Sequence, residues 1–208
     1  MKIEDTPRPG RPKSEEKRDA ILQAASDLFL ARGLQNTSMD AVAKSAGVSK
    51  QTVYSHYHNK DELYRAVIVN KVESYGFGAT ALPADSDLED AIFILGKRFL
   101  NLLFDDEVVR MYRVVIGESA VHRKIAEIFY ETGPGTTLRA IETFLERQAK
   151  QGRLKIDDLS YAAAQFLTMI CGHYQMRLLM NLKPELTDNM IDEHVRKAVR
   201  QFLKLYAA

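Results

Sequence analysis

The stretch from Thr37 to Leu63, TSMDAVAKSAGVSKQTVYSHYHNKDEL, predicts two short helices joined by a tight turn. Thr37 and Ser38 are typical N-cap residues, because their hydroxyls accept hydrogen bonds from backbone N–H groups that lack a partner at a helix start. Gly47 supplies the permissive backbone that a sharp exit from a helix needs, and Ser49 caps the next helix. The spacing therefore predicts a helix, a turn and a second helix within this one segment.

The second of these helices carries mostly polar and aromatic side chains, and only Val53 and Tyr57 face inward. Such groups reach phosphates and base edges, so the pattern indicates a helix-turn-helix whose second helix enters a DNA major groove. We expect Thr37, Ser38 and Lys60 to contact phosphate, and Gln51 and its neighbours to lie nearer the bases. The expected DNA-binding residues are Lys13, Thr37, Ser38, Ser49, Lys50, Gln51, Thr52, Tyr54, His56, Tyr57 and Lys60.

Four motifs of this segment occur in the same order in a known family. They are the Thr37–Ser38 pair, Ala46-Gly47-Val48-Ser49, Tyr54-Ser55-His56-Tyr57 and Asn59-Lys60-Asp61-Glu62-Leu63. With them the segment closely resembles the DNA-binding domain of the tetracycline-repressor (TetR) family of bacterial transcriptional regulators. Many members carry Gly early in the second helix, where this chain has Gln51, a residue able to bind adenine through two hydrogen bonds. We therefore do not expect the operator sequence of a Gly-bearing relative.

The resemblance implies an all-α fold in which a three-helix DNA-binding domain precedes a helical bundle for ligand binding and dimerisation. It implies a homodimeric repressor that binds a palindromic operator and is released by a small hydrophobic or aromatic effector. The run Phe129-Tyr130-Glu131-Thr132-Gly133-Pro134 is similar to a branch that controls multidrug efflux, which suggests efflux or detoxification genes as targets. An activator would use the same DNA contacts.

The sequence predicts that the chain is divided into three segments. We expect residues 1–13 to form a flexible basic arm, residues 14–63 the DNA-binding domain and residues 64–208 the second domain. The arm, which contains Arg8-Pro9-Gly10-Arg11-Pro12-Lys13, can lie along phosphates or in a minor groove, although a solvated tail is the alternative. We expect a first helix that begins after Ser14 and runs to Arg32, and that supplies the apolar stripe that a three-helix unit needs.

The remainder of the chain predicts helices separated by Gly and Pro. One helix continues to about Tyr75, and a break follows at Gly76-Phe77-Gly78. Further helices are expected over 88–104, 106–117, 121–131, 136–151, 157–181 and 187–206. We find no pattern typical of a strand.

The second domain is rich in aromatic and Met side chains, with a few polar groups among them. Apolar walls carrying a few polar groups describe most ligand sites, but core packing is the competing interpretation for each of these residues. The expected ligand-binding residues are Phe93, Phe104, Met111, Tyr112, Phe129, His173, Tyr174 and Arg177.

The last two predicted helices look like a dimer surface. One alternates small and large groups, and the other has an apolar stripe. The residues concerned are Tyr161, Ala164, Gln165, Thr168, Met169, Gly172 and Gln175 on the first, and Val195, Val199, Phe202 and Tyr206 on the second.

Composition excludes several other classes. The chain has 208 residues, a formal net charge of +1 and a single cysteine, Cys171, which cannot form an intrachain disulfide. It shows no charged-then-apolar leader and no apolar span of bilayer length, so we expect a cytoplasmic protein without a membrane partner.

Enzyme motifs are also missing from the sequence. The five histidines show no HExxH or paired-cysteine spacing, and no glycine-rich phosphate loop or Gly-x-Ser-x-Gly elbow occurs. We therefore expect no catalytic residue, no metal and no cofactor. The alternative is a helical small-molecule-binding protein or enzyme with an incidental helix-turn-helix, because fold and function can differ. Salt-dependent retention on DNA, with release by a ligand, would distinguish the two.

Overall fold

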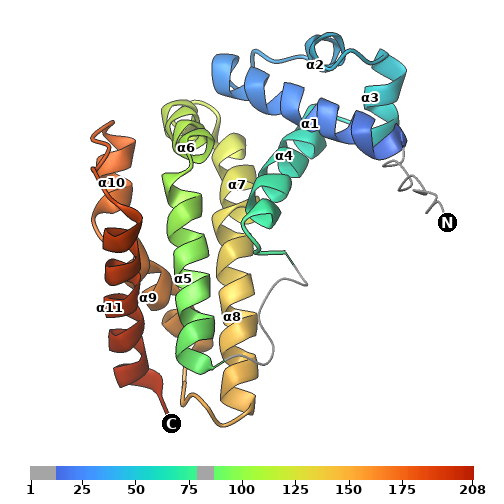
Figure 1. Ribbon diagram of the computed structural model, residues 1–208. Coiled ribbons are helices and arrows are strands. Elements are labelled where there is room, and N and C mark those ends of the chain that lie inside the picture. Colours follow the sequence, from blue (N-terminus) through green and yellow to red (C-terminus); the bar gives the residue numbers. More distant parts are fainter. Residues whose placement is uncertain (1–12, 79–86) are drawn as a thin grey trace, which may run out of the picture. The chain divides into compact units, whose positions relative to one another are not determined.

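The computed structural model describes residues 13–78 and 87–208, and every regular element in those residues is a helix (Figure 1). The first four are α1 (Lys13–Arg32), α2 (Met39–Ser45), α3 (Lys50–His56) and α4 (Lys60–Ser74). The next are α5 (Leu88–Phe104), α6 (Asp106–Ser119), α7 (Arg123–Thr132) and α8 (Pro134–Lys150). The last are α9 (Leu159–Cys171), α10 (Tyr174–Leu179) and α11 (Asp188–Tyr206). The expected all-α class is confirmed.

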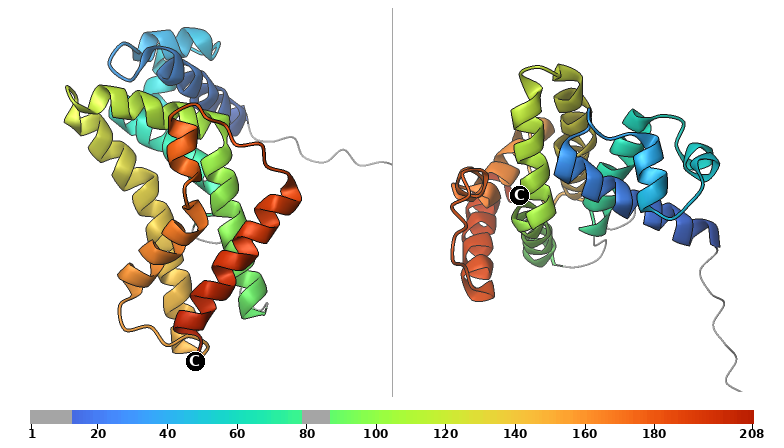
Figure 2. Two further views of the ribbon diagram at one scale, coloured as in Figure 1. Left: turned by 90° about the vertical axis from the view of Figure 1, so that its left-hand side faces the viewer. Right: turned by 90° about the horizontal axis from the view of Figure 1, so that it is seen from above.

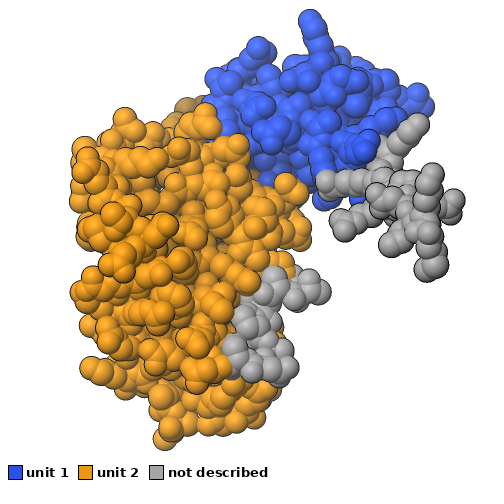
Figure 3. Space-filling model, in the orientation of Figure 1, with its two compact units in different colours: residues 1–67 blue, residues 68–208 orange. Residues whose placement is uncertain are grey.

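The helices form two compact units, residues 1–67 and residues 68–208 (Figure 3). The division falls within α4, after Val67, whereas the expected domain boundary lies after residue 63. Helix α4 therefore begins in the first unit, and its last turns belong to the second.

The first unit encloses a small core between α1, α2, α3 and the start of α4. Ile21 and Phe29 of α1, Val53 of α3 and Leu63 of α4 are each at most 1% exposed. The Phe29 and Tyr64 rings meet edge to face with centroids 5.3 Å apart, an arrangement favoured by the aromatic quadrupoles. These contacts hold the short helices α2 and α3, which at seven residues each are too short to be stable alone.

The second unit is a helical bundle in which α11 packs against α5 and α9, and α8 packs against α9 and α7 (Figure 2). Gly96 of α5 lies close to both α9 and α11, because a Cβ atom there would lie 2.8 Å from Ile170 Cδ1 and 2.9 Å from Val195 Cγ1. Such distances are below van der Waals contact. A larger residue at this position would force Ile170 of α9 and Val195 of α11 to shift, so glycine lets α5 pack closely against both helices.

The predicted helix over 157–181 is wrong, because the structure divides it at Gly172 into α9 and α10. Gly172 has φ 51° and ψ −136°, a conformation that residues with a Cβ atom rarely adopt. Its backbone N–H donates to the Thr168 carbonyl at 2.9 Å and closes the last turn of α9. The Gly133-Pro134-Gly135 break is also shorter than expected, because Pro134 already occupies the first position of α8, where proline needs no hydrogen-bond partner.

The apolar stripe of α11 belongs to the core of the same chain. Val195, Val199 and Phe202 are each fully buried against α5 and α9. Their expected place on a dimer surface is therefore wrong, since a buried side chain cannot pack against a second subunit. None of the helices in residues 13–78 and 87–208 combines the length and apolarity that a bilayer span requires.

Candidate nucleic-acid interface and effector region

Side-chain caps set the two helices of the predicted helix-turn-helix. The Ser38 hydroxyl accepts a hydrogen bond from the Ala41 N–H at 3.1 Å, and the Ser49 hydroxyl accepts one from the Thr52 N–H, also at 3.1 Å. Gly47 lies between them with φ 66°, the left-handed conformation that ends α2 and turns the chain toward α3. The local structure therefore follows directly from the sequence of the segment.

Helix α3 divides its side chains between the core and solvent. Val53 is fully buried, whereas Gln51, Tyr54 and Ser55 are exposed, with Tyr54 at 41%. The exposed groups include amide and hydroxyl donors and acceptors of the kind that recognise base edges. The buried side of α3 thus anchors the helix, and its polar side is available to a partner.

Lys50, at the start of α3, is tied to α2 in the free protein. Its Nζ atom lies 2.9 Å from Asp40 Oδ1, and it sits 5.8 Å from the centroid of the Tyr54 ring. The hydrogen bond and the charge of Asp40 raise the pKa of Lys50. Because both partners are more than 60% exposed, this ion pair is readily exchanged for another anion.

Thr37 has a structural role in place of the expected phosphate contact. It is 3% exposed, and its hydroxyl lies 2.8 Å from the Gly33 carbonyl and 3.2 Å from the Leu28 carbonyl. The side chain therefore ties the end of α1 to the start of α2. Tyr57 is likewise 6% exposed, and burial raises the pKa of its hydroxyl.

Lys60 also makes an internal contact, because its ammonium donates to the backbone carbonyl of Gln35 at 3.1 Å. The start of α4 is fixed by Asn59, whose Oδ1 atom accepts from the Glu62 N–H at 2.9 Å, while Glu62 Oε2 accepts from the His58 N–H at 2.8 Å. Asn59 and Glu62 thus form an Asn-headed variant of the capping box, with the return bond displaced by one residue. The side chain of Lys13 and the rest of the basic arm lie outside the described residues.

Five of the expected ligand-binding residues form one aromatic pair between α6 and α7 and a second group at the start of α10. Tyr112 of α6 and Phe129 of α7 meet edge to face with centroids 4.8 Å apart. Burial raises the pKa of Tyr112 to about 12, although a hydrogen bond with Gln175 opposes the shift. The ring centroid of Phe104 lies 5.7 Å from that of Tyr174, and the centroids of Tyr174 and His173 are 4.5 Å apart. Here the aromatic groups contact one another.

Three other expected ligand residues are not brought into this group. Phe93 is covered by the Arg196 guanidinium, which lies 4.3 Å from its ring centroid. Arg177 is exposed, and Met111 is 7% exposed within the packed core. Core packing, the competing interpretation, therefore describes Met111.

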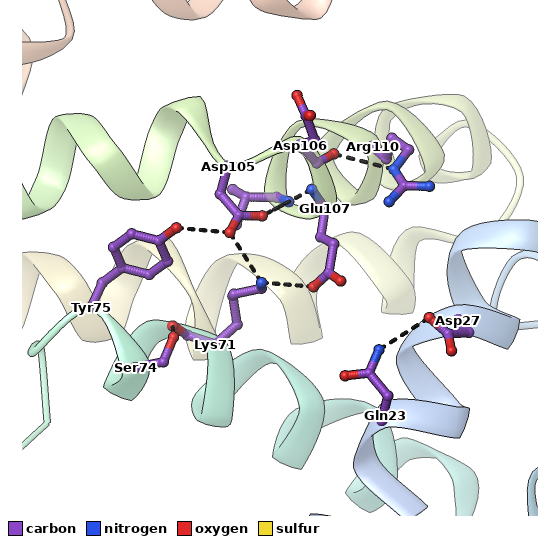
Figure 4. A network of polar contacts seen from close by, with 10 residues as sticks. Gln23, Asp27, Lys71, Ser74, Tyr75, Asp105, Asp106, Glu107 and Arg110 are labelled. Carbon is purple, nitrogen blue, oxygen red and sulfur yellow. Dashed lines mark hydrogen bonds and ion pairs between the residues drawn. The ribbon is translucent and has the colours of Figure 1, made fainter. Parts of the chain in front are cut away.

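A polar network that the sequence did not indicate joins the last turns of α4 to the start of α6 (Figure 4). Lys71 Nζ lies 3.1 Å from Asp105 Oδ2 and 2.6 Å from Glu107 Oε2, and the Tyr75 hydroxyl donates to Asp105 Oδ2 at 2.7 Å. The other carboxylate oxygen of Asp105 caps α6 by accepting from the backbone N–H groups of Glu107 and Val108. Only the run Asp105-Asp106-Glu107, which is typical of a helix start, was visible in the sequence.

Within this network Asp105 and Lys71 are held in their charged forms, and the hydroxyl of Tyr75 is held neutral. Partial burial acts to raise the pKa of Asp105, but hydrogen bonds from Tyr75, Lys71 and the Val108 N–H lower it below its ordinary value. Burial likewise opposes the charge of Lys71, whereas hydrogen bonds to Glu107 and Asp105 raise its pKa overall. Burial and the nearby Asp105 raise the pKa of Tyr75 to about 12.

A cavity of about 300 Å³ lies on another side of α6, against the end of α10. Val109 and Leu178 provide its apolar surface, and Arg110 and Lys183 line it with positive charge. None of the expected ligand-binding residues lines this cavity. In the part of the chain that the structure describes, no group of three His, Cys, Asp or Glu residues is placed to hold a metal ion.

One face of α9 stays exposed along its length. Tyr161 is 64% exposed, and Ala164 and Thr168 are exposed on the following turns. The Thr168 hydroxyl donates to the Ala164 carbonyl at 2.8 Å, so its polar group is already satisfied. This face combines small side chains with an exposed aromatic ring.

Two sequence families match the chain, one in each unit. Residues 21–67 match the family described as "Bacterial regulatory proteins, tetR family", and residues 90–208 match "AefR-like transcriptional repressor, C-terminal domain". The first match contains α2 and α3, and the second contains most of α5 and all the helices from α6 to α11.

Individual relatives agree with these matches. The activator FasR of Mycolicibacterium smegmatis is 33% identical over 102 residues, and the chain spans about half the length of FasR, with 46% of FasR and 49% of this chain aligned. The uncharacterized regulator YdeS of Bacillus subtilis is 27% identical over 195 residues, covering 94% of this chain and 92% of YdeS. The solved structure of "Flavonoid-responsive Regulator FrrA" is 33% identical with a TM-score of 0.73, covering 93% of this chain and 98% of that one.

Proposed function

Since the chain belongs to the tetR family of bacterial regulatory proteins, we propose that it is a homodimeric repressor that leaves a palindromic operator when a small hydrophobic or aromatic effector binds. The observation that carries this proposal is the exposed polar face of α3 on a helix whose opposite side is anchored in a core. An enzyme with an incidental helix-turn-helix is the weaker interpretation, since the relatives are regulators over both units.

Base recognition is assigned to the exposed side chains of α3. Gln51 can bind adenine through two hydrogen bonds, and Tyr54 can contact a base or the sugar-phosphate backbone. Ser38, Ser49, Thr52 and His56 are proposed to position the helix against phosphate. Lys50 would exchange Asp40 for a phosphate when DNA binds, since its ion pair is exposed.

Dimerisation is assigned to the exposed face of α9. Small residues at Ala164 and Thr168 permit close helix approach, and Tyr161 supplies a large apolar contact. A two-fold dimer would place two recognition helices on successive major grooves, which requires a palindromic site.

The effector is assigned to the aromatic pair of Tyr112 and Phe129, with Phe104 and Tyr174 as neighbouring contacts. A flat aromatic ligand would replace ring-to-ring contacts of the same kind, and the Tyr112 hydroxyl offers a hydrogen bond inside an apolar site. That FrrA is described as flavonoid-responsive supports an aromatic effector.

The network of Lys71, Tyr75, Asp105 and Glu107 is proposed to couple the effector region to the DNA-binding unit. Helix α4 contains residues of both units, so a change at the start of α6 bears directly on a helix that enters the first unit. Coupling requires that the effector bind one arrangement more tightly than the other, typically by about 1–3 kcal/mol.

The target genes are proposed to serve efflux or detoxification, which the run from Phe129 to Pro134 supports, and the protein would act in the cytoplasm beside the genome. Footprinting of the DNA beside its own gene tests the repressor proposal. At physiological salt the purified protein should protect a palindromic segment and prefer it over random DNA. Equal binding to random DNA would overturn the proposal, and transcript levels of the neighbouring genes would identify the pathway.

A further inference from the structure

We propose that the cavity between α6 and α10 binds the carboxylate of a small organic acid, at a site distinct from the aromatic pair of Tyr112 and Phe129. The cavity of about 300 Å³ has room for several times the volume of a water molecule, about 30 Å³. Val109 and Leu178 offer contact to an apolar body. The ligand class follows from the charges around these two residues.

The charge of the cavity lining is strongly one-sided. Three cationic side chains, Arg110, Arg113 and Lys183, face one carboxylate, Asp106. Positive charge beside an apolar surface selects an anion with an apolar part, since a neutral ligand leaves the charges unused and an inorganic anion leaves the apolar surface unused.

Arg113 is committed to the framework of the cavity. Its Nε atom donates to the Leu179 carbonyl at 3.2 Å, and one terminal nitrogen donates to the Leu178 carbonyl and to Asn181 Oδ1. These bonds fasten the end of α10 to α6. Arg113 therefore shapes the site, and the direct anion contacts fall to the other two cations.

Arg110 and Lys183 are both placed to accept an anion. Arg110 uses its Nε atom to hold the Asp106 backbone carbonyl at 3.3 Å, and a guanidinium has further N–H donors in a fork that matches a carboxylate. Lys183 Nζ lies 3.1 Å from Asp106 Oδ1, with the two side chains 66% and 75% exposed. Such an exposed pair is weak, so a ligand carboxylate can take the place of Asp106.

The site adjoins the polar network of α4 and α6. Figure 4 places Asp106 and Arg110 on one side of the first turn of α6, and Asp105 and Glu107 on the side where Lys71 lies. A carboxylate that releases Lys183 from Asp106 changes a contact on the same turn of α6 that binds Lys71 of α4. An effect on DNA binding rests on the proposed function, whereas binding of the acid does not.

Ligand-observed NMR titration of the full chain tests the site with benzoate, with benzamide as its uncharged counterpart and with inorganic phosphate. We expect benzoate to bind at least about fivefold more tightly than benzamide, because benzamide lacks the charge-assisted hydrogen bonds. Phosphate should be the weaker anion. Equal binding of benzoate and benzamide, or tighter binding of phosphate, overturns the proposal.

Matched variants locate the binding. Arg110→Gln and Lys183→Gln should each weaken benzoate binding about tenfold, the loss of one charge-assisted hydrogen bond. Arg123→Gln and Lys197→Gln remove exposed cations that pair with Glu127 and Glu193 outside the cavity. These two variants should bind benzoate as tightly as the wild type. An equal loss in the control variants would refute the location.

Asp106→Asn gives a test of opposite sign. It removes the carboxylate that competes for Lys183, so benzoate should bind about threefold more tightly. Weaker binding would contradict the proposed exchange. Operator binding is measured separately: an intact operator complex without benzoate binding refutes only the cavity, and benzoate binding without operator recognition refutes only the regulator.

Discussion

Helices α3 and α6 both begin at a side-chain cap, but they direct their polar groups differently. Around α3, Gln51, Tyr54 and Ser55 are exposed, and Val53 alone of its seven residues is buried. Around α6, Asp105 and Glu107 bind Lys71 of α4, and Arg113 binds the end of α10. The polar side chains of α3 thus face solvent, whereas those around α6 bind other helices of the same chain.

This difference separates recognition from communication. A side chain that must bind a partner is best left free of internal bonds, since each internal bond has to be broken first. A side chain that must transmit a change has to be bonded to a neighbour, because only a connected element responds to it. Substitutions of the exposed side chains of α3 should therefore alter DNA affinity and leave stability unchanged, whereas substitutions of the bonded side chains around α6 should alter stability.

The largest expected effect is on DNA affinity. Gln51→Ala should weaken operator binding by about 1–3 kcal/mol per half-site, since a bidentate base contact is lost. Fluorescence anisotropy with a labelled operator measures this. Gln35→Ala, which removes an exposed glutamine outside α3, is the control and should bind like the wild type. A change in melting temperature for Gln51→Ala would indicate that Gln51 also stabilises the fold.

The next effect is on stability. Asp105→Asn keeps an N-cap side chain on α6 but removes the charge that binds Lys71 and accepts from Tyr75. We expect a loss of about 1–2 kcal/mol in the free energy of unfolding, as measured by urea denaturation, because hydrogen bonds to a charged group are lost. Unchanged stability would mean that the charge of Asp105 does not stabilise the fold.

The difference in the free energy of unfolding between the wild type and Asp105→Asn should also depend on pH. Because the folded-state pKa of Asp105 is lowered, its stabilisation is full above the unfolded value, about 3.9, and is lost as pH falls through the folded value. The difference in stability between wild type and Asp105→Asn should therefore shrink on acidification toward about pH 3. A difference that is constant over this range would exclude the charge of Asp105 as its cause.

The smallest effect concerns Asp40→Asn, which frees Lys50 from its exposed ion pair. Binding to all DNA sequences should tighten about twofold, and the salt dependence should steepen by about 0.9 for each phosphate that Lys50 newly contacts. The melting temperature should not change. Reduced affinity together with a shallower salt dependence would show that Asp40 holds Lys50 in its DNA-binding position.

The first unit could be predicted largely from local chemistry. The starts of α2, α3 and α4 follow from Ser38, Ser49 and Asn59, each of which accepts a backbone hydrogen bond in the structure. The role of Thr37 could not be predicted from local chemistry. Its hydroxyl looks like a cap beside DNA, but the carbonyls that it contacts lie at the end of α1 and can be placed only in the folded chain.

The second unit depends on contacts between distant parts of the chain, which the sequence does not reveal. An apolar stripe such as Val195, Val199 and Phe202 has the same spacing whether it packs within one chain or between two. Likewise Lys71 lies 34 residues from Asp105, and Arg113 lies 66 residues from Leu179, so neither contact leaves a local motif. The sequence contains Gly172, but it does not reveal the positive φ angle with which this residue ends α9.

The role of α3 in recognising the operator can be tested by selection from a random DNA library, carried out with the wild type and Gln51→Ala side by side. The wild type should select two symmetric half-sites about one helical turn, or a small multiple of it, apart. Gln51→Ala should select the same arrangement but lose its preference at one base position in each half-site. Identical base preferences for the two proteins, or no selected sequence for either, would contradict the assignment of α3 as the helix that recognises the operator.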